Sequence, residues 1–451
     1  MSVEAGAARR LRDGWLLLLL AEAALLLVVL GATGELSGGF TPDTQAYFAI
    51  ATSPDPWGGP RSPLYGFVAS RLGGSATTTG VVALVQALLH VAAVFVLYGG
   101  ARIAGIGRVA AFALSTAALF SQSDLYHLRL LIPEAPANSF LLAAVGLTLA
   151  ATRSRRALWL LLVPIALLAG AGYLLRPTQL PSIVVLPALH LVFAWRRRDR
   201  PLVPAIALML ALVLPFVALS AHRLRAVGDF NIVSFGGYQM SGLAAFMLTP
   251  DTVARLPEQV RPFAQRVLER RGQAEAAGEV PAIPLNSAGE RSFVSATLGY
   301  FDIYARAYDN MLAYVIKPLL PEGESWVDSN KRLMQFSLAT VLADPLRYPA
   351  WVGGAAARLA GHAIATNVPM LMALALWFAL LVAAFVRQRS APVEDGEAVS
   401  LLALAWFVSN GALPVLVTFP AARYIDTAAI LLPAIPLMLA IALGRALRGS
   451  A

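Results

Sequence analysis

The sequence predicts an all-α polytopic membrane protein, and three observations lead to this fold class. The chain has 451 residues, of which 58% are hydrophobic and 14% charged, whereas ordinary soluble domains have about 25% charged residues. Long apolar runs recur along the whole chain. Basic residues fall in alternate gaps between those runs. These features together predict about ten transmembrane helices and an outward-facing helical cap.

The transmembrane helices are predicted from length and apolarity. A spanning helix needs about 20 mostly apolar residues to cross about 30 Å of hydrocarbon. Ten windows meet this requirement at least loosely: 15–32, 79–98, 108–123, 137–152, 157–175, 180–195, 202–222, 364–386, 399–417 and 425–444. The first window follows a basic stretch, as in a signal peptide. No convincing small-residue cleavage pattern comes after it, so we expect a retained helix.

The distribution of arginine predicts how the helices are oriented. Arginines precede the first apolar run and then occupy every second gap: Arg9, Arg10, Arg12, Arg102, Arg108, Arg153, Arg155, Arg156, Arg196, Arg197, Arg198, Arg200, Arg387, Arg389, Arg445 and Arg448. By the positive-inside rule these gaps and both termini are cytoplasmic. The other gaps then face outward, and they contain Asp43, Asp124, Glu134 and Arg176.

Two long outward segments divide the chain. Residues 1–222 form an N-terminal set of helices whose first outward loop, 33–78, is rich in Gly, Pro and aromatic residues; this composition favours a packed or interfacial loop. Residues 223–363 contain amphipathic stretches, including a helix of alternating charge over 253–278, and we expect them to form the cap. Residues 364–451 return to the membrane.

Charge and cysteine content narrow the classes of partner. The net charge is +9, but many of the arginines lie in the gaps assigned to the cytoplasm, where they meet anionic lipid headgroups. We therefore expect membrane lipids as partners and no nucleic acid. The chain has no cysteine, which excludes disulfides and thiolate metal sites.

Two acidic residues lie where the chain enters a helix on the outward side. Asp43 follows Pro42, and Glu134 follows Pro133. Taken singly, such an acid is often an N-cap, worth about 1 kcal/mol, or a partner of the helix dipole. Two acids at the outward ends of separate spans make a better candidate site than either one alone.

Five short segments, in order along the chain, resemble motifs of the GT-C superfamily of membrane glycosyltransferases, which includes protein O-mannosyltransferases and lipid A aminoarabinose transferases. The segments are 43–51 (DTQAYFAIA), 61–65 (RSPLY), 130–134 (LLIPE), 174–178 (LLRPT) and 423–424 (RY). The resemblance implies a GT-C-like fold. It also implies transfer of a sugar from a polyprenyl-phosphate donor to a lipid, glycan or protein acceptor.

The resemblance also implies roles for the outward acids. Asp43 would be the general base that takes a proton from the acceptor. Glu134, with Asp124, would orient the acceptor or hold a divalent cation through hard oxygen ligands. If Mg²⁺ or Mn²⁺ takes part, Asp43 and Glu134 are its ligand candidates.

Arginines are the candidates for binding the donor phosphate, because guanidinium matches phosphate oxygens in a bidentate manner. The resemblance implies this role for Arg176, Arg423 and Arg61; the alternative is an interfacial arginine whose head reaches water. Further site candidates on the same side are His127, Arg129 and Tyr65.

Two other functions fit the sequence. A ligase or polymerase of lipid-linked polysaccharide would also suit a large outward segment. A lipid or solute transporter would place polar groups near the bilayer midplane, and Glu22, His90 and His190 are the residues that favour it. For the glycosyltransferase we expect the inner membrane of a bacterium, with the active site facing the periplasm.

Overall fold

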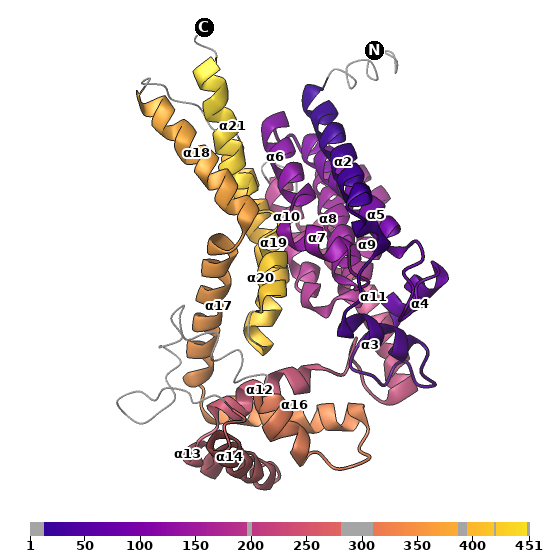
Figure 1. Ribbon diagram of the computed structural model, residues 1–451, viewed down its shortest axis with the longest axis vertical. Coiled ribbons are helices and arrows are strands. Elements are labelled where there is room, and N and C mark those ends of the chain that lie inside the picture. The colour runs from indigo at the N-terminus through magenta and orange to yellow at the C-terminus, as the bar shows by residue number, and fades with distance from the viewer. Residues whose placement is uncertain (1–12, 196–200, 281–309, 387–394, 419–420, 449–451) are drawn as a thin grey trace.

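The computed structural model has a bundle of long helices at one end and a smaller group of helices, the cap, at the other (Figure 1). The structure describes residues 13–195, 201–280, 310–386, 395–418 and 421–448. Within these ranges every regular element is a helix, and a single bridge between Gly39 and Leu130 is the one β-type pairing. The all-α prediction is confirmed for this part of the chain.

Eight helical segments in the described ranges are long and apolar enough to cross a membrane. They are Gly14–Ala32 (α2), Val82–Ile103 (α5), Glu134–Ala151 (α8), Arg155–Leu175 (α9), Pro177–Trp195 (η2 at Pro177–Gln179 and α10 at Ser182–Trp195), Leu202–Val227 (α11), Val368–Val386 (α18) and Gly396–Val417 (α19). Such helices indicate an integral membrane protein.

The other two predicted windows hold shorter helices. Window 108–123 contains α6 (Arg108–Leu119), whose 12 residues extend about 18 Å at about 1.5 Å per residue. Window 425–444 is divided between α20 (Ala422–Ala428) and α21 (Ala434–Arg448). The break comes before Pro433, because proline has no N–H to donate and its ring clashes with the preceding turn.

Helix α8 is the centre of the bundle, with 89% of its membrane window buried. It packs so closely on α5 that a Cβ atom on Gly100 would collide with the carbonyl oxygen of Gly146. Small residues allow this approach of two helix backbones. Because Glu134 is the first residue of α8, the same packing fixes the position of Glu134 at the cap-side end of the bundle.

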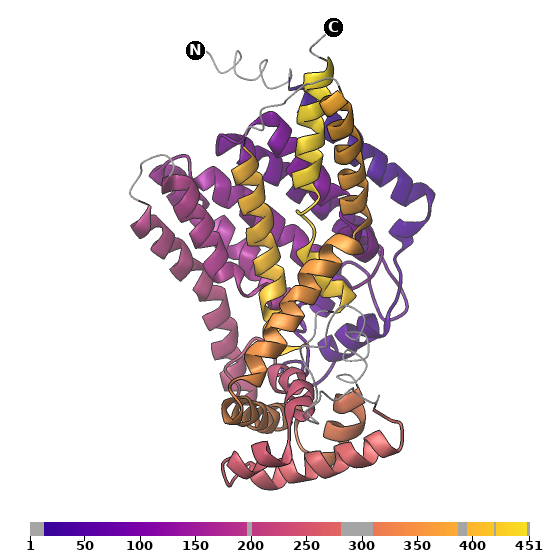
Figure 2. The same cartoon turned by 90° about the vertical axis from the view of Figure 1, so that its left-hand side faces the viewer.

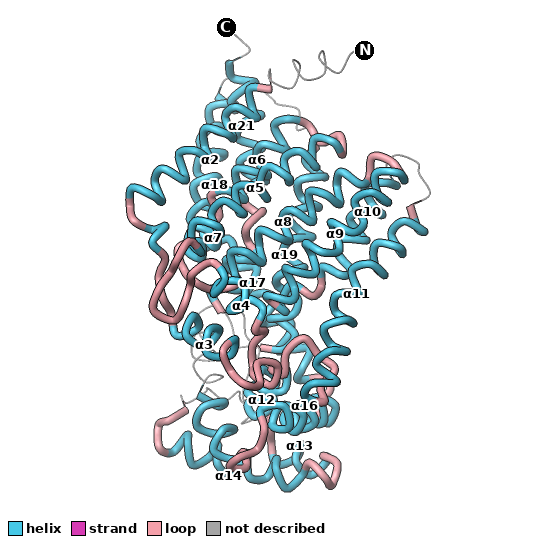
Figure 3. The backbone as a smooth tube through the Cα atoms, turned by 90° about the vertical axis from the view of Figure 1, so that its right-hand side faces the viewer, coloured by secondary structure: helices cyan, strands magenta, loops and turns pink. Residues whose placement is uncertain are grey.

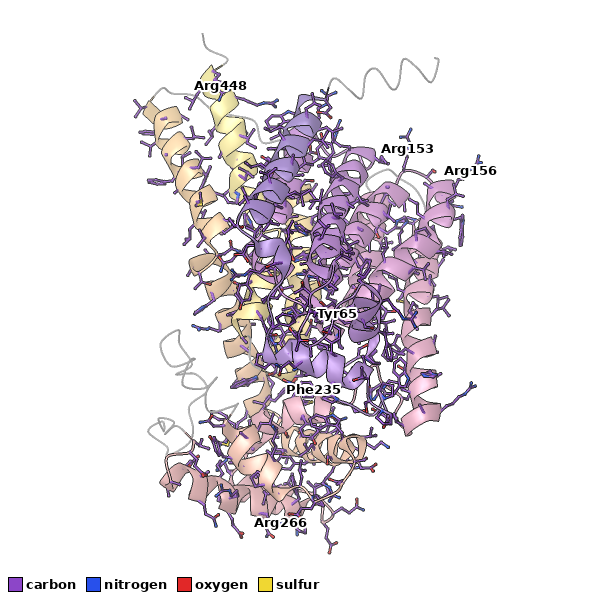
Figure 4. All side chains as sticks on the ribbon, turned by 45° about the vertical axis from the view of Figure 1, so that its right-hand side comes forward. Tyr65, Arg153, Arg156, Phe235, Arg266 and Arg448 are labelled. Atoms are coloured by element: carbon purple, nitrogen blue, oxygen red, sulfur yellow. The ribbon has the colours of Figure 1, made fainter. Side chains whose placement is uncertain are left out.

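The labelled arginines and the chain-terminal helices show which residues lie at each end of the molecule. Arg153, Arg156 and Arg448 lie at the end away from the cap, and Arg266 lies in the cap (Figure 4). Helix α2 begins and α21 ends at the end away from the cap (Figure 1). The predicted cytoplasmic arginines at 9–12, 196–200 and 387–389 fall outside the described residues.

Short elements lie between the bundle and the cap (Figure 3). They are η1 (Glu35–Ser37), α3 (Pro42–Ala51), α4 (Leu64–Arg71) and, nearer the bundle, α7 (Gln122–Leu128). A small core that includes Phe48, Tyr65 and Leu131 fixes α3 and α4 against the bundle. The segment 33–78 is therefore packed.

The cap has its own hydrophobic core. Its helices are α12 (Gly236–Met247), α13 (Pro250–Arg255), α14 (Arg261–Ala276), the π-helical η3 (Met311–Ile316), the 3₁₀ turn η4 (Lys317–Leu319) and α16 (Trp326–Ala343). The single helix expected over 253–278 is two helices, interrupted at Pro257. Helix α17 (Arg347–Ala365) leads from the cap to α18 (Figure 2), so the predicted segment 223–363 also includes most of α17.

Candidate functional site

A polar cavity of about 230 Å³ lies where the bundle meets the cap. From the bundle side, its charged and aromatic lining residues are Tyr47, Arg61, Glu134, Arg176, Arg423 and Tyr424. From the cap side, Phe235, Gly236 and Gln239 at the start of α12 complete it. Figure 4 shows Phe235 at this boundary, with Tyr65 on the bundle side.

Helix α3 presents Asp43 to this region, and Thr41, not Asp43, is its N-cap. The Thr41 hydroxyl accepts a hydrogen bond from the Thr44 amide at 3.2 Å, and the Thr44 hydroxyl accepts one from the Thr41 amide at 3.0 Å. Pro42 occupies the first helical position. Because Thr41 satisfies the helix end, the carboxylate of Asp43 is left for tertiary contacts.

Asp43 joins two arginines from distant parts of the chain. Its Oδ1 accepts from Arg61 Nη2 at 2.7 Å, and its Oδ2 accepts from Arg423 Nη1 at 2.9 Å. Partial burial alone would raise the pKa of Asp43, but the two guanidinium groups outweigh it and hold the pKa below its ordinary value. Asp43 itself is not among the residues that line the cavity, and its carboxylate is held by the two arginines that do line it.

Arg176 lies at the end of α9, where the chain leaves helical geometry. Pro177 disfavours a helical conformation for the residue before it, and Arg176 is accordingly extended, with φ −134° and ψ 95°. Its side chain is 5% exposed, donates to Thr427 Oγ1 at 2.9 Å and lies over the Tyr424 ring. It forms no ion pair with any described residue. A buried cation without an anion is costly, so this position favours an anionic ligand.

Thr427 organises the hydrogen bonds behind the arginines. Its one hydroxyl proton goes to the carbonyl oxygen of Arg423 at 2.8 Å, so Thr427 accepts from Arg176 and from Ser123, which lies at 3.0 Å. Ser123 then accepts from Nδ1 of His127 at 3.2 Å. Burial is the main cause that lowers the pKa of His127, and His127 is therefore neutral at neutral pH.

Two buried polar atoms of the cavity lining have no hydrogen-bond partner within the described residues. They are Oε2 of Glu134 and Oγ1 of Thr178. Glu134 is 7% exposed. Because buried polar atoms in proteins are nearly always paired, two unpaired atoms in one cavity indicate a place for a ligand with polar groups.

The structure does not bring Asp124 to the cavity. Its carboxylate is fully buried, and it accepts from Ser121 Oγ and from Asn138 Nδ2, both at 2.8 Å. Asn138 in turn accepts from Gln179 at 2.9 Å. Asp124 thus connects α7 to α8 inside the bundle, and the role expected for it in orienting an acceptor has no support from its position.

Tyr65 and Arg129 also lie outside the polar cavity. The Tyr65 hydroxyl donates to Gln86 Oε1 at 2.8 Å inside the bundle. Arg129 is 40% exposed and pairs with Glu35 at 3.2 Å. Arg129 is thus held by an ion pair away from the cavity, whereas Tyr65 lines an adjoining apolar cavity.

A second, apolar cavity of about 420 Å³ adjoins the polar one. It lies between α4, α5, α8, α9 and α11, and Leu175 lines both cavities. Its lining is aliphatic and aromatic apart from Tyr65 and Gln86, whose polar groups bond to each other. The two cavities together suit an amphiphile with an anionic head and an apolar tail.

The described residues do not fit a divalent cation at Asp43. Both carboxylate oxygens of Asp43 already accept from guanidinium groups, and a metal ion there would stand beside two positive charges. Across the described ranges, no group of three or more Asp, Glu or His side chains is arranged to hold a metal.

Sequence reasoning missed Thr427, Thr178 and Phe235. Thr427 follows Arg423 by four residues, and Thr178 follows Arg176 by two. Helical spacing from a candidate arginine could have found Thr427. No sequence signal places Phe235, because the position of the cap over the bundle is a tertiary property.

The comparisons with known proteins return no matching family model, no curated protein and no solved structure.

The polar residues that favour a transporter are engaged in packing where their contacts are described. Glu22 accepts a hydrogen bond from Thr116 at 2.7 Å, and His90 lies 3.8 Å from the Asp124 carboxylate.

Proposed function

We propose that the chain is an integral membrane glycosyltransferase of GT-C type, which moves a sugar from a polyprenyl-phosphate donor to a lipid, glycan or protein acceptor. One observation carries the proposal: the guanidinium of Arg176 is buried, faces a cavity and has no ion-pair partner among the described residues. A phosphate is the anion that a guanidinium binds best in a bidentate manner.

The adjoining features support a lipid-linked donor. Arg61 and Arg423 reach the same cavity as Arg176, so three cations surround the position for a phosphate. Preorganised cations lower the barrier where charge develops on a leaving group. The apolar cavity beside Leu175 can take the start of a polyprenyl chain.

The reaction also needs a base that takes up a proton and a site that excludes water. As the hydroxyl or amine of the acceptor attacks the sugar carbon, its proton must pass to a base, and Asp43 and Glu134 are the carboxylates nearest the cavity. The cap residues Phe235, Gly236 and Gln239 line the cavity from the cap side. Exclusion of water would keep the sugar from being hydrolysed.

We place the protein in a bacterial inner membrane, and the arginine distribution supports an orientation with the cap in the periplasm. On this proposal the start of α12 meets the acceptor, since Phe235, Gly236 and Gln239 line the cavity from the cap side.

The direct test uses the purified protein in lipid nanodiscs. Binding of polyprenyl phosphate is measured, and release of polyprenyl phosphate is followed by mass spectrometry from polyprenyl-phosphate glucose, mannose and arabinose with a membrane extract as the source of acceptor. We expect saturable binding and release from at least one donor. Absence of both binding and release would refute the proposed function.

A further inference from the structure

The two carboxylates near the cavity, Asp43 and Glu134, differ in whether their oxygens already accept hydrogen bonds. Both oxygens of Asp43 accept from arginines, at 2.7 and 2.9 Å, and Asp43 is absent from the cavity lining. Glu134 lines the cavity, and its Oε2 is buried with no hydrogen-bond partner in the described part of the chain. A general base must reach the hydroxyl or amine of the acceptor substrate with an available lone pair.

We propose that Glu134 is the general base of the transfer and that Asp43 positions Arg61 and Arg423. This inference rests on the proposed function, and it reverses the roles that the sequence suggests for the two acids. Geometry decides between them: Glu134 lines the cavity with an unpaired oxygen, whereas both oxygens of Asp43 already accept hydrogen bonds from guanidinium groups.

The surroundings of Glu134 fit a base that acts on a bound acceptor. Glu134 is 7% exposed and begins α8, the most buried of the spanning helices. Its carboxylate is thus held on a rigid element, as a catalytic group requires. Thr178 Oγ1, the other unpaired buried atom of the cavity, can bond to a second polar group of the sugar or acceptor.

The proposed step is a base-assisted substitution at the sugar carbon. The acceptor oxygen or nitrogen donates its proton to a Glu134 oxygen as it forms a bond to the sugar carbon. The bond between that carbon and the phosphate oxygen breaks, and its electron pair leaves with the polyprenyl phosphate. The new negative charge of the phosphate lies among Arg61, Arg176 and Arg423.

Asp43 has a different task in this arrangement. It holds Arg61 from the loop after α3 and Arg423 from α20 side by side. Two guanidinium groups would otherwise repel each other, and a carboxylate between them offsets the repulsion. Asp43 is therefore a positioning residue, and its loss should alter binding of the phosphate more than the chemical step.

The test compares Glu134→Gln with Asp43→Asn in the donor assay, with kcat and KM measured separately. Loss of a general base lowers the rate by about 10²–10⁴-fold. We expect Glu134→Gln to lose kcat by that factor while its Kd for polyprenyl phosphate changes less than about threefold. Asp43→Asn should keep kcat within about twofold and bind polyprenyl phosphate about two- to fivefold more tightly, because a carboxylate that competes for the arginines is gone.

A second variant keeps the test decisive if Glu134→Gln is poorly folded. Glu134→Ala, supplied with formate as a small external base, should regain activity in proportion to formate, and Asp43→Ala should not. A loss of kcat confined to Asp43→Asn, with Glu134→Gln near wild type, would overturn the inference and leave the proposed function intact. A wild-type protein that binds and transfers nothing would refute both.

Discussion

Replacing Arg176 by alanine separates ligand binding from stability. The Arg176 guanidinium is 5% exposed, and its partners are the Thr427 hydroxyl and the Tyr424 ring, both neutral. Arg176→Ala therefore breaks no ion pair among the described residues. Because it also removes a buried charge that lacks an anion, we expect thermal stability to be unchanged or higher.

The effect on the donor should be large. A hydrogen bond between charged groups contributes about 1.5–3 kcal/mol, which corresponds to about 10- to 150-fold in Kd for polyprenyl phosphate at about 1.4 kcal/mol per factor of ten. Arg176→Lys should fall between wild type and alanine, since lysine keeps the charge but cannot bind two oxygens in a fixed fork.

Arg129→Ala is the matched control. Arg129 is an arginine near the same end of the bundle, but it pairs with Glu35 and lies outside the cavity. Its removal should leave Kd for polyprenyl phosphate within about twofold, as for most exposed ion pairs. Binding is measured with labelled polyprenyl phosphate in nanodiscs, and stability by thermal unfolding in detergent. If Arg176→Ala lowered stability but kept the affinity, Arg176 would be structural and the reasoning wrong.

Three further predictions follow from the fold and from the buried groups. Because the chain has no native cysteine, single cysteines at Thr77 and Ala276 should react with an impermeant maleimide in intact cells and one at Arg153 only after permeabilisation; the reverse pattern would invert the topology. Arg223→Ala should yield misfolded protein, since buried Arg223 donates hydrogen bonds to Asp229 and to the Trp57 carbonyl oxygen, and breaking a buried ion pair costs about 3–5 kcal/mol. Arg225→Ala, at an exposed arginine, is the control, and normal thermal stability of Arg223→Ala would contradict the structural role of Arg223. The pKa of His127 lies below its ordinary value of 6.5, so as the pH drops below about 6.5 the unfolded chain takes up a proton before the folded one and stability falls. His127→Gln should therefore lose less thermal stability than wild type between pH 7 and pH 5, and an equal loss in the two proteins would contradict the lowered pKa of His127.

The sequence predicted those properties that depend on local composition. Apolar windows identified the long helices, and the alternating arginines grouped Glu134, Arg176 and Arg423 at one end, where all three line one cavity. The same reasoning could not separate Asp124 from this group. The predicted topology places Asp124 and Glu134 on the same side. Only the hydrogen bond from Asn138, 14 residues after Asp124, shows that the Asp124 carboxylate is bonded inside the bundle.

The roles of the two acids depend on contacts between distant segments. Arg423 lies 380 residues after Asp43 and still donates to it, and Thr427 lies 251 residues after Arg176. Composition and spacing identify which residues carry charge, but these pairings decide which charges remain free. For this reason the motif around Asp43 identifies an acid that pairs with Arg61 and Arg423, but it does not predict which acid has an unpaired oxygen.

The charge of the cavity predicts a preference for donors with one phosphate. Arg61, Arg176 and Arg423 supply three positive charges, and the carboxylates of Asp43 and Glu134 offset two, which leaves one. A polyprenyl-phosphate sugar is a phosphodiester with one negative charge and balances it. A diphosphate-linked sugar would bring one more anion without a partner, at a cost of about 1–3 kcal/mol, or at least about fivefold in affinity. Competition between polyprenyl-phosphate glucose and polyprenyl-diphosphate glucose measures this directly, and Glu134→Gln should reduce the preference because it adds one net positive charge. Tighter binding of the diphosphate to the wild-type protein would mean that the carboxylates do not contribute to donor selection.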